Sequence, residues 1–108
     1  MTVLGLKEAM KLTAFALPEG GRAVCGGYAG DLLSWVMGRA KADDAWITIM
    51  SNPNIVAVAA LADVGCVILC EGVAPDEGVA KLAADKGVNL LGSDQPAFEL
   101  SARISRLL

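Results

Sequence analysis

The feature that most constrains the fold is an apolar run from Ile55 to Cys70, which reads IVAVAALADVGCVILC. A helix over Asn54–Ala62 is apolar on every side, and a strand over Gly65–Cys70 is apolar on both faces. Such elements need cover from both sides, as central parallel strands have in α/β proteins. The run falls short of the roughly 20 apolar residues that cross a membrane, and Asp63 interrupts it. We therefore expect a buried helix that leads into a central strand.

Strands and helices of about ten residues alternate along the rest of the chain. This alternation predicts one α/β domain over residues 1–108, with three layers and a mostly parallel sheet flanked by helices. Apolar spacing directs Leu32, Leu33, Val36 and Met37 inward in the second helix, and Leu100, Ile104 and Leu107 inward in the last. Helices are expected over Thr2–Met10, Asp31–Ala40, Asn54–Ala62, Pro75–Lys86 and from Ser93 onward, and strands over Leu12–Ala16, Arg22–Cys25, Ala45–Met50, Gly65–Cys70 and Val88–Leu91.

Charge and cysteine usage narrow the class of protein. The formal net charge is −3, and Lys and Arg form no run. Nucleic acids and anionic membrane surfaces are therefore poor partners, since both are bound through clustered cations. The odd number of cysteines, three, gives no disulfide framework, and no charged and apolar leader opens the chain. These features predict a cytoplasmic protein.

Candidate ligand-binding residues follow the strands, because ligands of open α/β sheets bind beyond the carboxyl ends of the strands. Amide groups at the start of a helix are free to bind anions, so glycine- and asparagine-rich junctions suit an anionic or polar ligand. Helix capping by Asp31, Asn52 and Ser93, and an edge position for Tyr28, are the competing interpretations. The candidate residues are Gly26, Gly27, Tyr28, Asp31, Ser51, Asn52, Asn54, Ser93 and Asp94.

Catalytic and metal-binding patterns are weak. The chain has no histidine and no phosphate-binding G-x-x-x-x-G-K-[ST] motif, and no basic residue lies within the RNA-type GXXG pattern Gly27–Gly30. An acid–base pair of Asp31 with Asp94 is a minor alternative. In a strand, Cys66 and Cys70 lie about 13 Å apart, too far to share a metal. We expect no catalytic residues, no metal and no cofactor, with a redox switch at Cys25 as a further alternative.

Apolar residues outside the expected core predict a second copy of the chain. A domain this small has few helices with which to cover both faces of a sheet. The all-apolar third helix, together with Trp35 and Trp46, is therefore expected to be buried partly in a two-fold interface.

Several segments resemble the DRTGG domain family: RAVCGGY from Arg22, DLLS from Asp31, WIT from Trp46, NPNIVAVA from Asn52, and SD at Ser93 followed by AFEL from Ala97. The motif that gives the family its name is only partly kept. Arg22, Gly26 and Gly27 remain, whereas Gly21 stands for the aspartate and Cys25 for the threonine. Asn52 replaces a histidine that is frequent in the family.

The resemblance implies a regulatory α/β domain similar to the N-terminal domain of HPr kinase/phosphorylase. Related domains accompany CBS domains in inorganic pyrophosphatases and precede phosphotransacetylase domains, and stand-alone members are encoded near iron-only hydrogenase components in anaerobic bacteria. We therefore expect a non-catalytic, homodimeric sensing domain for a small anion or nucleotide. The alternative is a ligand-free module that docks on a metabolic or redox enzyme or on a kinase.

Overall fold

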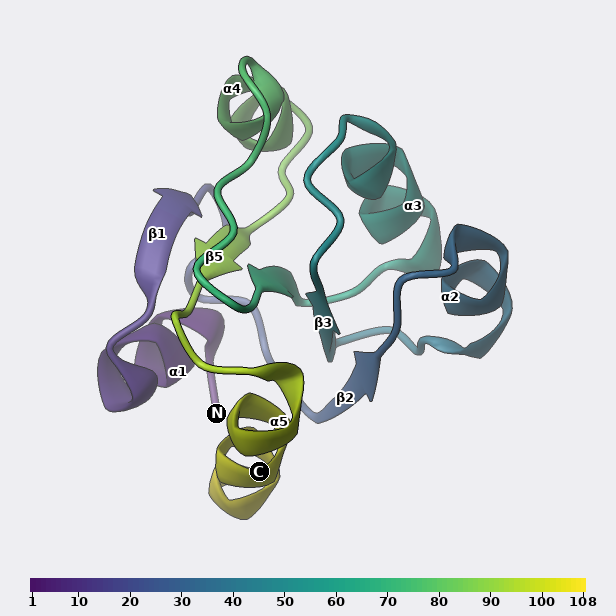
Figure 1. The fold of residues 1–108 in the computed structure, drawn as a ribbon. Coiled ribbons are helices and arrows are strands. Elements are labelled where there is room, and N and C mark those ends of the chain that lie inside the picture. The colour runs from purple at the N-terminus through teal and green to yellow at the C-terminus, as the bar shows by residue number, and fades with distance from the viewer.

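The computed structural model describes residues 1–108 as three layers, with a five-stranded sheet between two sets of helices (Figure 1). The strand order is β1-β5-β4-β3-β2; β2 to β5 are parallel, and β1 is antiparallel to β5. The expected three-layer α/β domain is confirmed. The elements are α1 (Val3–Met10), β1 (Thr13–Ala16), β2 (Gly26–Ala29), α2 (Leu33–Arg39), β3 (Asp44–Thr48), α3 (Asn54–Ala62), β4 (Cys66–Leu69), α4 (Val79–Asp85), β5 (Leu90–Gly92) and α5 (Ala97–Leu107).

The two apolar faces of β4 separate two cores. Val67 and Leu69 pack with buried residues of α2, α3 and α4, whereas Cys66 and Ile68 pack with those of α1 and α5. All four residues of β4 are fully buried, which confirms its expected central position. Helix α3 buries only one side, since Leu61 is 73% exposed, so the expected burial on all sides was wrong. No helix is both long enough and apolar enough to pass through a lipid bilayer.

The expected strand over Arg22–Cys25 was wrong, because Arg22, Ala23 and Val24 pair with the chain's own N-terminus instead of with the sheet. Arg22 accepts a hydrogen bond from the amide of Val3, and the amide of Val24 donates to Met1. The strand begins four residues later, at Gly26. Glycine favours close packing against β3 there: a Cβ at Gly26 would lie 2.9 Å from Asp44 Oδ1, and one at Gly27 would lie 3.3 Å from the Ala45 carbonyl oxygen.

Several expected core positions are also corrected. Val36 is buried in α2, but Leu32 and Met37 are exposed, because the helix presents a single narrow face to the sheet. Leu107, near the end of α5, is likewise exposed. Trp46 is fully buried and its indole Nε1 donates to the Gly30 carbonyl at 2.9 Å, so it takes no part in a surface for a second copy.

Two glycines give a matched test of this packing. A Cβ at Gly65 would lie 2.8 Å from the Ala23 carbonyl oxygen, and a backbone atom cannot move aside as a side chain can. We expect Gly65→Ala to lower the free energy of unfolding by roughly 1–3 kcal/mol through overpacking. Gly38 in α2 has open space around it, so Gly38→Ala should raise stability by roughly 0.5 kcal/mol. Urea denaturation of both variants measures the difference, and equal effects would contradict the packing argument.

Candidate functional site

The loops that follow the parallel strands meet at one end of the sheet, which we call the carboxyl rim: residues 30–32, 49–53, 70–78 and 93–96. In Figure 1 these loops lie toward the reader. The structure brings Asp31, Ser51, Asn52, Asn54, Ser93 and Asp94 to this rim, at the ends of β2, β3 and β5. The prediction that Gly26, Gly27 and Tyr28 belong to a rim loop was wrong, because all three lie within β2.

Hydrogen bonds join each rim loop to the next, and Asp31 makes the first of these links. Its Oδ1 accepts from Thr48 Oγ1 at 2.7 Å and from the Ile49 amide at 3.0 Å. The carboxylate thus ties the end of β2 to the end of β3. It does not cap α2, which begins at Leu33 without a side-chain cap.

Ser51 makes the second link, between the loops after β3 and β4. Its hydroxyl donates to Asp76 Oδ1 at 2.8 Å, and the Asp76 amide donates back to the Ser51 carbonyl at 2.9 Å. Asn52 Oδ1 accepts from the Asn54 amide at 2.9 Å, which forms an Asx turn ahead of α3. The N-cap of α3 is Pro53, without a side-chain cap, so the expected capping by Asn52 was wrong. Sequence reasoning missed Asp76, because a residue 25 positions away gives no local sign of the pairing.

The third link joins the loops after β4 and β5. The Glu71 amide donates to the Gln95 carbonyl and the Gly72 amide donates to the Ser93 carbonyl, both at 2.9 Å. Ser93 Oγ accepts from the Gln95 amide at 3.1 Å. Gln95 Oε1 is buried without a hydrogen-bond partner, the one such side-chain atom in the chain. The four loops therefore form one continuous polar belt.

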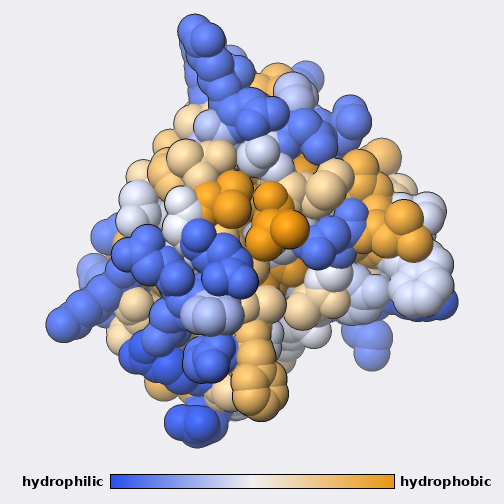
Figure 2. Space-filling model, in the orientation of Figure 1, coloured by the Kyte–Doolittle hydropathy of each residue, from blue (hydrophilic) through white to orange (hydrophobic).

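This belt leaves some donors free and is edged by apolar side chains. The Ser51 and Asn52 amides have no acceptor in the chain, and they lie where α3 begins. Leu32, Ile49 and Phe98 are exposed beside the belt, and hydrophobic and hydrophilic patches alternate on this face (Figure 2). An anion with an attached apolar group matches such a surface, since free amides bind anions.

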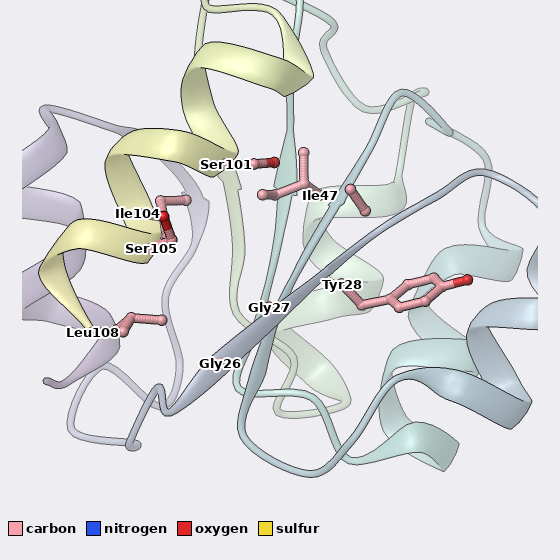
Figure 3. Close-up of a pocket in the computed structure, with 9 residues that line it drawn as sticks. Gly26, Gly27, Tyr28, Ile47, Ser101, Ile104, Ser105 and Leu108 are labelled. Atoms are coloured by element: carbon pink, nitrogen blue, oxygen red, sulfur yellow. The ribbon is translucent and has the colours of Figure 1, made fainter.

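The residues of β2 line cavities on both sides of the strand. A cavity of about 450 Å³ lies between β2 and α5, and Figure 3 shows that Ser101, Ser105 and Leu108 face it. A second cavity, of about 380 Å³, lies beside Cys25 and Gly26 and is lined by Arg39 and Lys41. Tyr28 packs against the core formed with α2, α3 and α4, which agrees with the edge position considered for it.

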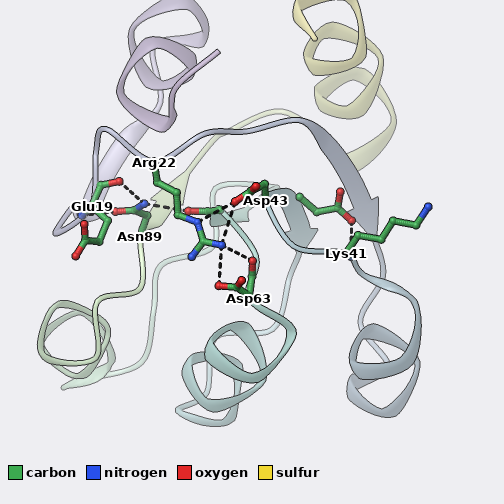
Figure 4. A network of polar contacts seen from close by, with 8 residues as sticks. Glu19, Arg22, Lys41, Asp43, Asp63 and Asn89 are labelled. Carbon is green, nitrogen blue, oxygen red and sulfur yellow. Dashed lines mark hydrogen bonds and ion pairs between the residues drawn. The ribbon is translucent and has the colours of Figure 1, made fainter.

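Arg22 holds together the opposite, amino-terminal end of the sheet (Figure 4). Its Nη2 lies 3.1 Å from Asp43 Oδ1 and 2.8 Å from Asp63 Oδ1, and it also donates to the Asp63 carbonyl. Burial acts to lower the pKa of Arg22, but the hydrogen bonds and charges of Asp63 and Asp43 outweigh it and raise that pKa. Both aspartates have positive φ, so the guanidinium fixes two sharp turns before β3 and β4.

The three cysteines fall into two classes. Cys25 is exposed, whereas Cys66 and Cys70 are buried in the core formed with α1 and α5. Burial raises the pKa of the Cys66 thiol to about 12 and also raises the pKa of Cys70. No group of three or more Cys, Asp or Glu side chains is arranged to hold a metal ion.

A family model for the DRTGG domain matches residues 29–107, most of the chain. The chain belongs to the DRTGG domain family. The match begins just after Gly21, Arg22, Cys25, Gly26 and Gly27, the residues compared above with the naming motif. In this DRTGG domain Arg22 has a structural role at the amino-terminal end of the sheet, far from the carboxyl rim.

The fold also matches a solved structure: the CBS and DRTGG domains of the regulatory region of Clostridium perfringens pyrophosphatase, complexed with its activator diadenosine tetraphosphate. The TM-score is 0.72 at 16% sequence identity, over 99% of this chain and 47% of that one. This DRTGG domain thus spans about half the length of that regulatory chain. No curated protein matches the sequence.

Removal of Arg22 should loosen the turns that precede β3 and β4. We expect Arg22→Met to cost about 1–2 kcal/mol, because charged hydrogen bonds are lost while the two partly exposed aspartates can turn to water. Arg103→Met, which removes an exposed arginine without an ion pair, should stay within about 0.5 kcal/mol. Chemical denaturation of both variants at neutral pH provides the measurement, and an unchanged Arg22→Met would contradict the assigned role.

The buried thiol of Cys66 should make stability fall in alkali. The folded protein keeps this proton until a pH of about 12, whereas the unfolded chain releases it near pH 8.5. Stability is therefore complete below about pH 8.5 and declines by roughly 1.4 kcal/mol per pH unit between the two values. The difference between wild type and Cys66→Ala, measured by denaturation from pH 7 to 10, isolates this term. Parallel pH profiles would contradict the burial of a protonated thiol.

Proposed function

We propose that this DRTGG domain is a non-catalytic regulatory domain that works as a homodimer and senses a small anion or nucleotide at the carboxyl rim. The observation that supports this most is the belt of linked loops, which fixes the free amides of Ser51 and Asn52 on a rigid frame. Preformed donors bind an anion without an ordering cost. Asn54 stands exposed beside them at the first position of α3.

A nucleotide fits the mixed character of this surface. Its phosphates suit the amides at the start of α3, and its base suits the exposed apolar side chains of Leu32 and Ile49. The activator in the matched pyrophosphatase structure is itself a nucleotide, which makes this ligand class the first to test. Asp31 and Asp94 are assigned to order the loops or to bind a ribose or a cation.

The proposed ligand site at the carboxyl rim omits three of the residues predicted from sequence. Gly26, Gly27 and Tyr28 lie within β2, and the two glycines are accounted for by close packing against β3. The remaining candidates are kept as the proposed site: Asp31, Ser51, Asn52, Asn54, Ser93 and Asp94.

A second candidate function is a ligand-free module that docks on an enzyme or a kinase. Exposed apolar residues favour it: Phe98 is 81% exposed and Leu61 is 73% exposed. Leu61 borders a cavity of about 310 Å³ between α3 and α4 that has an apolar floor. We place either activity in a bacterial cytoplasm, where three unpaired cysteines are stable.

Thermal shifts with AMP, ADP, ATP, diadenosine tetraphosphate, acetyl phosphate and phosphate test the sensing function. A ligand at about 100 times its Kd adds about 2.7 kcal/mol, which should raise Tm by on the order of 10 °C. Asn54→Asp places a negative charge beside the free amides, yet favours the helix start, so it should abolish the shift and keep the fold. Ala84→Asp, which adds the same single negative charge at an exposed position of α4, should leave the Tm shift intact.

The outcomes separate the two candidate functions. A shift that Asn54→Asp removes and Ala84→Asp retains supports a ligand at the rim. If no compound moves Tm, the sensing function is rejected in favour of the docking module. If both variants respond as the wild type does, a ligand binds elsewhere and the rim assignment is wrong.

A further inference from the structure

The outer edge of β2 is an unpaired sheet edge. β2 ends the strand order and bonds to β3 alone. The Gly30 amide donates to the Ile47 carbonyl, and backbone groups alternate in direction along a strand, so Gly26 and Tyr28 face β3. Gly27 and Ala29 therefore direct their N–H and C=O groups away from β3, toward solvent.

This edge lacks the protection that the opposite edge has. Native sheets shield their edges with charges, prolines, bulges or covering elements. β1, at the other edge, has an irregular register between Ala14 and Ala16, and α4 packs against it. β2 reads Gly-Gly-Tyr-Ala, a regular strand with no charge and no proline. Such an edge is suited to pair with another strand.

The groove beside β2 is uncharged. Ser101, Ser105 and Leu108 of the α5 segment line it together with Gly27 (Figure 3). The charged residues of α5, Glu99, Arg103 and Arg106, are absent from this lining. A second apolar surface can therefore approach the α5 flank and the β2 edge together without burying a charge.

The charges at the two ends of β2 favour a second copy of this same chain as the occupant. Asp31 is exposed two residues beyond the carboxyl end of the strand. The cavity beside Cys25 and Gly26, at the amino end of β2, is lined by the exposed Arg39 and Lys41 and by the buried Asp44, so basic groups outnumber acidic ones there. When two such strands pair antiparallel about a two-fold axis, the acidic end of each meets the basic end of the other, twice. A parallel arrangement would instead place like charges together.

We propose that two copies pair antiparallel through β2, joining their sheets and closing the groove beneath α5. This inference rests on the homodimer in the proposed function and assigns its interface. Because a two-fold contact uses the same surface on both copies, each β2 edge is covered in the dimer and no further copies can add.

Amide hydrogen exchange measured by NMR tests the interface directly, because Gly27 and Ala29 direct their N–H groups away from the only strand that pairs with β2. Both amides should exchange slowly in a concentrated sample and at least ten-fold faster once dilution below the dimer Kd gives monomer. A dimer by light scattering in which both amides exchange freely would overturn the β2 interface while the homodimer stands. A monomer at millimolar concentration would overturn both proposals, whatever the ligand screen shows.

Two charge-reversal variants test whether the charged ends of β2 set the antiparallel orientation. In the fold Lys41 is engaged through its backbone: its amide donates to Asp44 Oδ2 and its carbonyl accepts from the Asp44 amide. Its side chain makes no hydrogen bond or ion pair, so Lys41→Glu should keep Tm. It places an acidic group against Asp31 of the second copy at both ends, and the dimer Kd should rise about ten-fold or more. Lys86→Glu, the same charge change at the exposed C-cap of α4, should leave Kd within about two-fold. Equal effects of the two variants on Kd would overturn the assigned orientation.

Discussion

Burial of β4 on both faces is the constraint on which the rest of the structure depends. Every residue from Cys66 to Leu69 is fully enclosed, so helices must cover both sides of the sheet. Burial of this kind contributes roughly 1.5–3 kcal/mol for each large apolar side chain, against about 0.5–1.5 kcal/mol for an ordinary hydrogen bond. Parallel neighbours β3 and β5 then follow, and with them a rim where the connecting loops gather.

The same constraint shows what sequence could predict. Apolar residues on both faces of a strand indicate its place in the sheet without any knowledge of partners, so the central strand, the layers and the rim loops after β3, β4 and β5 were predictable. Positions that depend on partners were not. A glycine pair reads equally as a turn or as a strand packed closely on its neighbour, and at Gly26 and Gly27 only Asp44 and Ala45 of β3 decide between them.

Side-chain polarity was equally ambiguous in the sequence. Asp31 looks like a helix cap from its position, yet its carboxylate bonds to Thr48 at the end of the next strand and to Ile49 in the loop that follows. The sequence pattern places Trp46 outside the core, as part of an interface with a second copy. In the structure its indole N–H donates to the Gly30 carbonyl, and that hydrogen bond makes full burial possible. In each case the deciding partner is 16 to 18 residues away, beyond the reach of local patterns.

Asp31 connects the two surfaces to which we assign function. Its carboxylate bonds to the Ile49 amide in the loop that carries Ser51 and Asn52, and its position just beyond β2 places it at the proposed interface. A ligand on those amides and a second copy at β2 would thus act on opposite sides of one hydrogen-bonded link. Linkage then requires reciprocity: a ligand that tightens the dimer must itself bind the dimer more tightly, by the same factor. A domain with both proposed features would convert ligand concentration into assembly without any chemical step.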